Sequence, residues 1–208
     1  MLGLVADNLT CVKRDRVLFD ALSFSLSPGQ LLYLRGPNGA GKTSLLRLLT
    51  GLSEPDKGII CFDGTPINTS MSYQRELVYL GHKTGLNGNL TALENLRFWL
   101  AQHEQPYSTE ATLTVLEKVG LAGMEEMPVR MLSAGQQRRV ALARLWLKPA
   151  RVWILDEPFT ALDTDGIALL EQAFASHTQN GGMLMTTSHQ PLSDACGNVD
   201  YLDLEFRF

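Results

Sequence analysis

The first fifty residues show two kinds of hydrophobic pattern. Residues 4–9 and 17–26 have the alternating, β-branched and aromatic character of short strands. Residues 31–34 form a short apolar run that is typical of a buried strand. After a glycine-rich loop, residues 43–50 carry leucines at helical spacing, and Gly51 is expected to close that helix. The pattern therefore predicts a strand, a loop and a helix in that order.

The rest of the chain changes from helical to mixed spacing. Between residues 72 and 147 the apolar positions recur mainly at helical intervals, interrupted by proline and glycine. Strand patterns return at residues 152–155 and 183–187, with a helical pattern at 167–175 between them. Such alternation predicts an α/β fold with a mainly parallel sheet, antiparallel strands near the N-terminus, and helices on both faces.

The helical block is predicted to be an insertion within one domain. A length of 208 residues favours a single domain, 1–208, with a sizeable core. We expect residues of about 1–80 and 150–208 to form the core of that domain. Residues of about 85–147 would then form a helical subdomain.

The glycine-rich loop matches a phosphate-binding pattern, G-x-x-x-x-G-K-[ST]. Its glycines allow a tight turn that points backbone N–H groups at phosphate oxygens. Lys42 would reach the β- and γ-phosphates, the Thr43 hydroxyl would bind Mg²⁺, and Ser44 would reach the α-phosphate. The residues predicted to bind nucleotide here are Gly36, Pro37, Asn38, Gly39, Ala40, Gly41, Lys42, Thr43 and Ser44.

A second acidic motif follows the strand pattern at residues 152–155. Its two carboxylates, Asp156 and Glu157, lie at the carboxyl end of the strand, where ligands sit in open α/β sheets. Asp156 is expected to hold Mg²⁺ together with Thr43, directly or through water. Glu157 is expected to polarise the water that attacks the nucleotide. An isolated Asp-Glu pair would also be typical of a solvated strand end.

The segment LSAGQ at residues 132–136 begins a predicted helix. Ser133 and Gln136 form an S-x-x-Q capping box, which by itself indicates a well-capped helix start. Gly135 allows another backbone to approach closely, and a helix N-terminus attracts anions.

The order of the phosphate loop, LSAGQ, the acidic strand and a late His189 resembles the ATPases of ABC transporters. The resemblance implies the ABC ATPase fold of the P-loop class, with ATP and Mg²⁺ as cofactors. It implies Lys42, Glu157 and His189 as catalytic residues, with His189 contacting the γ-phosphate and holding Glu157 and its water.

The same resemblance implies a head-to-tail dimer. Ser133, Gly135 and Gln136 would lie over ATP that is bound by a second copy of the chain. Asp163 belongs to a segment, residues 160–163, that resembles the loop through which the two subunits communicate.

Two positions depart from the family pattern. His82 occupies the place of a loop glutamine that senses Mg²⁺ and contacts the membrane partner, so direct metal contact there is in question. Lys13 and Arg14 stand where the family has an aromatic residue that stacks on adenine. Arginine can also stack on a base.

A narrower resemblance comes from LSAGQQRRVALARLWLKPARVWILDEPFTALDTDG and the later TTSHQPL. Together these segments resemble the ATP-binding subunits of bacterial cytochrome c maturation haem exporters. The resemblance implies a peripheral protein on the cytoplasmic face of the inner membrane, bound to an integral membrane permease. ATP hydrolysis would drive haem export or the release of a haem-loaded chaperone.

Composition limits the partners. The net charge of −4 gives no basic surface for nucleic acid, and no apolar run approaches the roughly 20 residues that span a bilayer. We therefore expect neither nucleic-acid binding nor direct membrane insertion. The three well-separated cysteines are typical of reduced thiols in a cytosolic protein.

Three other functions remain open. The chain could serve another small-substrate ABC transporter, since the ATP chemistry would be identical. It could be a soluble ABC ATPase that acts on nucleic acid or ribosomes, against which a short acidic chain argues. It could also bind nucleotide without hydrolysis, against which Lys42, Asp156, Glu157 and His189 argue.

Overall fold

The computed structural model of the chain describes residues 3–205. Its strands are β1 (Leu4–Lys13), β2 (Arg16–Leu26), β3 (Leu31–Arg35), β4 (Lys57–Phe62), β5 (Thr65–Pro66), β6 (Leu77–Leu80), β7 (Val152–Leu155), β8 (Met183–Thr186) and β9 (Val199–Asp203). Its α-helices are α1 (Lys42–Leu49), α2 (Met71–Arg75), α3 (Ala92–Gln102), α4 (Thr109–Lys118), α5 (Ala134–Leu142), α6 (Arg144–Leu147) and α7 (Thr164–Gln179).

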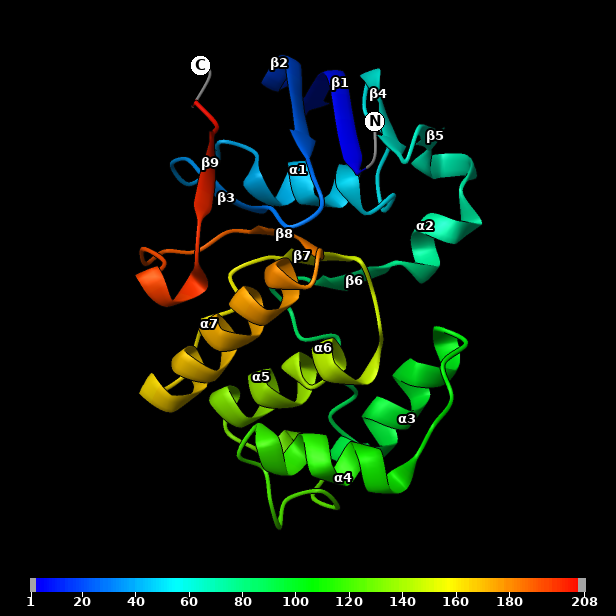
Figure 1. Cartoon of the computed structure of the whole chain (residues 1–208), viewed down its shortest axis with the longest axis vertical. Helices are drawn as coiled ribbons and strands as arrows, with labels where there is room; N and C mark the ends of the chain where they lie inside the picture. Colours follow the sequence, from blue (N-terminus) through cyan, green and yellow to red (C-terminus); the bar gives the residue numbers. More distant parts are fainter. Residues whose placement is uncertain (1–2, 206–208) are drawn as a thin grey trace.

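The strands form two sheets (Figure 1). The five-stranded sheet has the order β6-β7-β8-β3-β9, and its neighbouring strands run parallel. The four-stranded sheet has the order β2-β1-β4-β5 and is antiparallel. The predicted α/β fold, with a parallel core sheet and antiparallel N-terminal strands, is confirmed.

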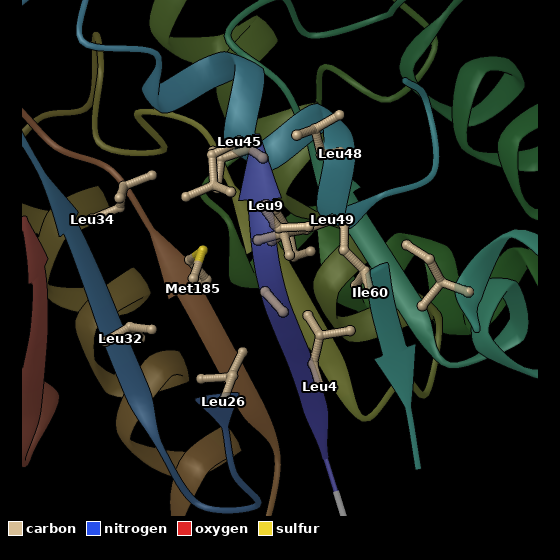
Figure 2. Packing of buried hydrophobic residues seen from close by; sticks show 14 of the residues in the cluster. Leu4, Leu9, Leu26, Leu32, Leu34, Leu45, Leu48, Leu49, Ile60 and Met185 are labelled. Carbon is tan, nitrogen blue, oxygen red and sulfur yellow. The ribbon is translucent and has the colours of Figure 1, made fainter. Parts of the chain in front are cut away.

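Helix α1 lies between the two sheets. Its leucines Leu45, Leu46, Leu48 and Leu49 are all buried, because they share one face of the helix, opposite the exposed Thr43 and Arg47. In Figure 2, Leu45, Leu48 and Leu49 pack near Leu9 of β1, with Leu34 of β3 and Met185 of β8 alongside. Each fully buried leucine contributes about 2 kcal/mol to stability. This packing fixes the start of α1, and therefore the preceding loop, against the parallel sheet.

Helices α3, α4, α5 and α6 gather at the end of the molecule away from the antiparallel sheet (Figure 1). They share a cluster of buried side chains that includes Leu96, Leu116 and Val140. Helix α3 begins with a capping box between Thr91 and Glu94. The division into a core of 1–80 and 150–208 and a helical subdomain of 85–147 stays a prediction. The domain's end residues 1 and 208 lie outside the described residues.

One part of the helical prediction was wrong. Residues 72–147 were described as mainly helical and no strand was predicted among them, but Leu77–Leu80, within the predicted core of 1–80, form strand β6 and pair in parallel with Val152–Leu155 of β7. A run of four apolar residues has no clear period, so strand pairing with a distant segment decided its structure. The helix after the phosphate loop ends at Leu49, and Gly51 follows its cap in the left-handed conformation, with φ of 72°.

A half-buried histidine on α7 packs against β7. The His177 ring stacks on Trp153 with centroids 3.8 Å apart, and its Nε2 lies 3.3 Å from the Met183 carbonyl oxygen. Burial lowers the pKa of His177 from 6.5 to about 4. The folded protein therefore holds this imidazole neutral at pH values where the unfolded chain would protonate it.

This burial predicts a loss of stability in mild acid. Because the unfolded chain binds the proton more readily, the contribution of His177 is complete above pH 6.5 and falls as the pH drops toward 4. The loss should reach about 3 kcal/mol at pH 4. Urea unfolding of the wild type and His177→Phe, measured at several pH values, checks this. Equal pH dependence of the two free energies of unfolding would contradict it.

Candidate nucleotide site

The phosphate loop connects β3 to α1. Gly41 caps α1 in the left-handed conformation with φ of 103°, which a side chain would strain. The Lys42 ammonium donates to the carbonyl oxygens of Gly36 at 2.6 Å and Pro37 at 3.2 Å. It therefore lies over the loop, beside backbone N–H groups at the start of a helix, which is a favourable place for a phosphate.

A cavity of about 230 Å³ opens at this loop. The residues that line it are Leu18, Asn38, Gly39, Gly41, Lys42, Thr43, Ser44 and Glu157. Ala40, also predicted in the loop, is buried beneath it. Leu18, on β2, was not predicted from the sequence, because an apolar residue in a strand carries no signal for ligand contact. Lys13 and Arg14 lie at the turn between β1 and β2 and are exposed.

The two predicted metal ligands meet at the carboxyl edge of the parallel sheet, where Asp156 follows β7 and Thr43 lies in the first turn of α1, after β3. Thr43 Oγ1 donates to Asp156 Oδ2 at 2.9 Å, although the two residues are 113 positions apart. Asp156 is only 2% exposed. A hydroxyl and a carboxylate are hard oxygen donors, which Mg²⁺ prefers when phosphates complete its shell. The pair therefore fits the metal that the sequence predicted.

Glu157 lies between two histidines. Its Oε1 is 2.8 Å from His189 Nε2, and its Oε2 is 3.4 Å from His82 Nδ1. The Glu157 side chain is 17% exposed, whereas the His82 and His189 side chains are 65% and 63% exposed. The structure thus places His82 beside the carboxylate that was predicted to orient water. His189 stands beside the same carboxylate, as its predicted role requires.

Thr187 joins the two carboxylate residues. Its hydroxyl donates to Asp156 Oδ1 at 2.8 Å and accepts from the Glu157 backbone N–H, also at 2.8 Å. Thr187 is fully buried at the end of β8. No role for Thr187 was predicted from the sequence, where the available signal is a hydroxyl residue directly after a buried strand and two positions before His189.

Removal of the Thr187 hydroxyl should slow hydrolysis. Thr187→Val keeps the shape but leaves a buried oxygen of Asp156 and the N–H of Glu157 without this partner, at a cost of about 1–3 kcal/mol. Displacement of Glu157 should lower kcat by about 10- to 100-fold. Thr187→Ser, which keeps the hydroxyl, serves as the control. A valine variant that hydrolyses ATP at the wild-type rate would refute this role.

The LSAGQ segment forms the predicted capping box. Ser133 Oγ accepts from the Gln136 N–H at 3.2 Å, and Gln136 Oε1 accepts from the Ser133 N–H at 2.8 Å. A Cβ on Gly135 would come within 2.5 Å of the Ala161 carbonyl oxygen, so this close approach requires glycine. Figure 1 shows α5 among the helices at the lower end, well separated from α1. Residues 132–136, which are all within the described part of the chain, do not line the cavity at the phosphate loop.

Asp163 caps helix α7. Its Oδ1 accepts from the Gly166 N–H at 2.9 Å and also pairs with the Arg139 guanidinium. The Gly166 N–H, together with Arg139, lowers the pKa of the Asp163 carboxyl. Because Arg139 is on α5, Asp163 ties the start of α7 to the helix that follows LSAGQ.

Comparison with known proteins identifies relatives of this chain. The family model for ABC transporters matches residues 19–160. A cytochrome c biogenesis ATP-binding export protein CcmA from Vibrio cholerae is 51% identical over 186 residues, covering 89% of this chain and 90% of the relative. The protein of the same name from Escherichia coli K12 is 49% identical over 202 residues, covering 97% and 96%.

Solved structures share the fold. A putative ABC transporter ATP-binding protein from Pyrococcus furiosus superimposes with a TM-score of 0.82 at 23% identity, covering 97% of each chain. The dimeric ATP-binding cassette MJ0796, bound to ADP and Pi, superimposes with a TM-score of 0.81 at 22% identity, covering 99% of this chain and 97% of that one. The chain therefore belongs to the ABC transporter family, as one of its ATP-binding proteins.

Proposed function

We propose that this chain is the ATP-hydrolysing subunit of a membrane complex that exports haem, or releases a haem-loaded chaperone, during c-type cytochrome biogenesis. The observation that supports the ATPase activity is a chain of hydrogen bonds that joins Thr43, Asp156, Thr187 and Glu157. In this proposal the first two residues hold the metal beside the Glu157 carboxylate. About 50% identity to cytochrome c biogenesis export proteins, over most of the chain, supports the pathway.

In this proposal each residue has one task at the nucleotide. Backbone N–H groups of the loop and the Lys42 ammonium hold the phosphates, and Thr43 with Asp156 holds Mg²⁺. The metal would neutralise charge on the β- and γ-phosphates. Glu157 orients the attacking water and takes its proton, while His189 keeps the carboxylate in place.

A second copy of the chain completes the site. Ser133, which is exposed, and the half-buried Gly135 and Gln136 form a helix start in the part of the molecule away from its own phosphate loop. A helix N-terminus binds anions, so this segment suits the γ-phosphate of ATP held by a partner copy. Closure would exclude water and add donors where charge develops. The solved cassette MJ0796 is dimeric.

A membrane subunit is proposed to dock on the side formed by α2 and α3. A groove of about 300 Å³ lies there, lined by Met71, Gln74, Arg75, Gln102, His103 and Glu104. Met71 is 78% exposed, and Phe98, one helical turn from Gln102, is 61% exposed. Exposed large apolar side chains beside a groove are typical of a protein interface. The occupant would be a cytoplasmic segment of an integral permease, which would hold the chain at the cytoplasmic face of the inner membrane.

Among residues 3–205, no helix has the length and apolar character to cross a membrane. We therefore expect Phe98→Ser to release the chain from the membrane fraction of its host, because the docking surface loses its largest apolar side chain. ATP hydrolysis by the purified chain should change little. Leu113→Ser, at an exposed leucine of α4, is the matched control. Equal membrane association of both variants would place the interface elsewhere.

The function itself is tested by deletion of the gene in its host and staining of membrane proteins for covalently bound haem. Loss of all c-type cytochromes, restored by the wild type and not by Glu157→Gln, is the expected result. Normal c-type cytochromes would overturn the pathway and favour another small-substrate transporter, with the ATPase activity still to be measured on the purified protein.

A further inference from the structure

Arg138 is a buried cation in the first turns of α5. It is 4% exposed, and burial lowers the pKa of its guanidinium. The hydrogen bonds described for it all go to main-chain carbonyl oxygens. Its acceptors and distances are Pro158 at 3.2 Å, Gly81 at 3.0 Å, Asp156 at 3.0 Å and Glu157 at 2.8 Å.

Three of these carbonyls belong to consecutive residues. In an extended strand, successive carbonyls point in opposite directions, so three of them cannot reach one group. Glu157 has a φ of 52°, in the left-handed region that a residue with a side chain rarely adopts. This turn directs the carbonyls of residues 156–158 toward the guanidinium. A conformation of this kind persists only where surrounding bonds enforce it.

The fourth acceptor lies on a different segment. The Gly81 carbonyl immediately precedes His82, and His82 Nδ1 lies 3.4 Å from Glu157 Oε2. One guanidinium thus holds the backbone of Glu157 and the backbone beside His82. It is carried by α5, whose N-terminus is formed by Ser133.

We propose that Arg138 is a positioning residue for ATP hydrolysis, which fixes the Glu157 turn against His82 and ties both to helix α5. The proposal rests on the proposed ATPase function. When nucleotide bound to a second copy contacts the α5 N-terminus of this chain, the contact would affect the position of this chain's Glu157, because Arg138 links α5 to the Glu157 turn. The Glu157 carboxylate would be held in place only when α5 keeps Arg138 within hydrogen-bond distance of the carbonyls of residues 156–158.

The planar guanidinium group of arginine is essential to this role. A guanidinium donates in several fixed directions at once, whereas a lysine ammonium is a compact point charge. Arg144, on the adjoining helix α6, provides a matched comparison. It is also buried, at 6% exposure, and donates to the Thr84 carbonyl at 2.9 Å and the Gly85 carbonyl at 3.4 Å, with no bond described to residues 156–158.

The test compares Arg138→Lys with Arg144→Lys in the full-length chain. We expect Arg138→Lys to lower kcat for ATP by about 10- to 100-fold with little change in KM, because the carboxylate is displaced while the phosphate loop is intact. Arg144→Lys should keep kcat near that of the wild type at a comparable loss of Tm. Equal kcat values for the two variants, whether both fall or both persist, would overturn the proposal.

Hydrogen exchange gives a second measurement that needs no hydrolysis. The backbone amides of Glu157 and residues 159–161 should exchange faster in Arg138→Lys and at the wild-type rate in Arg144→Lys. Unchanged exchange in Arg138→Lys would overturn the proposal. If the lysine variant fails to fold, Arg138→Gln removes the buried charge, keeps an amide donor and tests the same bonds. Failure of the proposed function would instead appear in the wild type, as absence of ATP hydrolysis.

Discussion

Replacement of Glu157 by glutamine is expected to lower ATP hydrolysis by about a thousandfold while ATP binding persists. A glutamine amide has nearly the same size but cannot take a proton from water. It leaves the phosphate loop and the contact between Thr43 and Asp156 untouched. Its oxygen can still meet His189, which lies 2.8 Å from Glu157 Oε1. The variant should therefore retain the geometry of the site without its chemistry.

Blocked hydrolysis should also trap the dimer. If ATP joins the phosphate loop of one copy to Ser133 of the other, a variant that cannot cleave ATP should remain paired. Size-exclusion chromatography of Glu157→Gln with and without Mg-ATP, with phosphate release as the activity assay, measures both effects. Glu117→Gln, at an exposed position on α4, is the control. A Glu157→Gln protein that stays monomeric with ATP and hydrolyses at the native rate would refute the assignment.

Replacement of Lys42 by alanine is expected to weaken ATP binding by about 10- to 100-fold. A hydrogen bond to a charged group contributes about 1.5–3 kcal/mol, which is one to two orders of magnitude in affinity. In the free protein, Lys42 donates to the Gly36 and Pro37 carbonyls at 2.6 and 3.2 Å. Lys42 must give up these two hydrogen bonds when it binds phosphate, which offsets part of the binding free energy it contributes. The loss of affinity in Lys42→Ala should therefore not exceed about 100-fold.

Equilibrium binding of a fluorescent ATP analogue to Lys42→Ala measures this loss. Lys57→Ala removes an exposed charge from β4 in the antiparallel sheet and should bind as the wild type does. Comparable affinities for the two alanine variants would show that the loop does not hold the phosphates through Lys42.

The local features of this protein were predictable because neighbouring residues determine them. Strand β7 occupies residues Val152–Leu155 as its apolar run predicted, since a fully apolar segment of that length before two carboxylates favours a buried strand. The Ser133 capping box formed as predicted, because its two hydrogen bonds join residues only three positions apart. The order of these motifs also identified the family.

The tertiary structure decided which distant residues meet. Strand β6 was not predicted as a strand, because pairing with β7, and not its own four residues, determines its structure. The place of His82 beside Glu157 and the bridge made by Thr187 depend on the order of parallel strands, which brings segments tens of residues apart to one edge. The role of Arg138 required a left-handed backbone at Glu157, which no hydrophobic pattern records. The sequence thus determined which chemical groups are available, and long-range packing determined which of them act together, since strand pairing sets their positions.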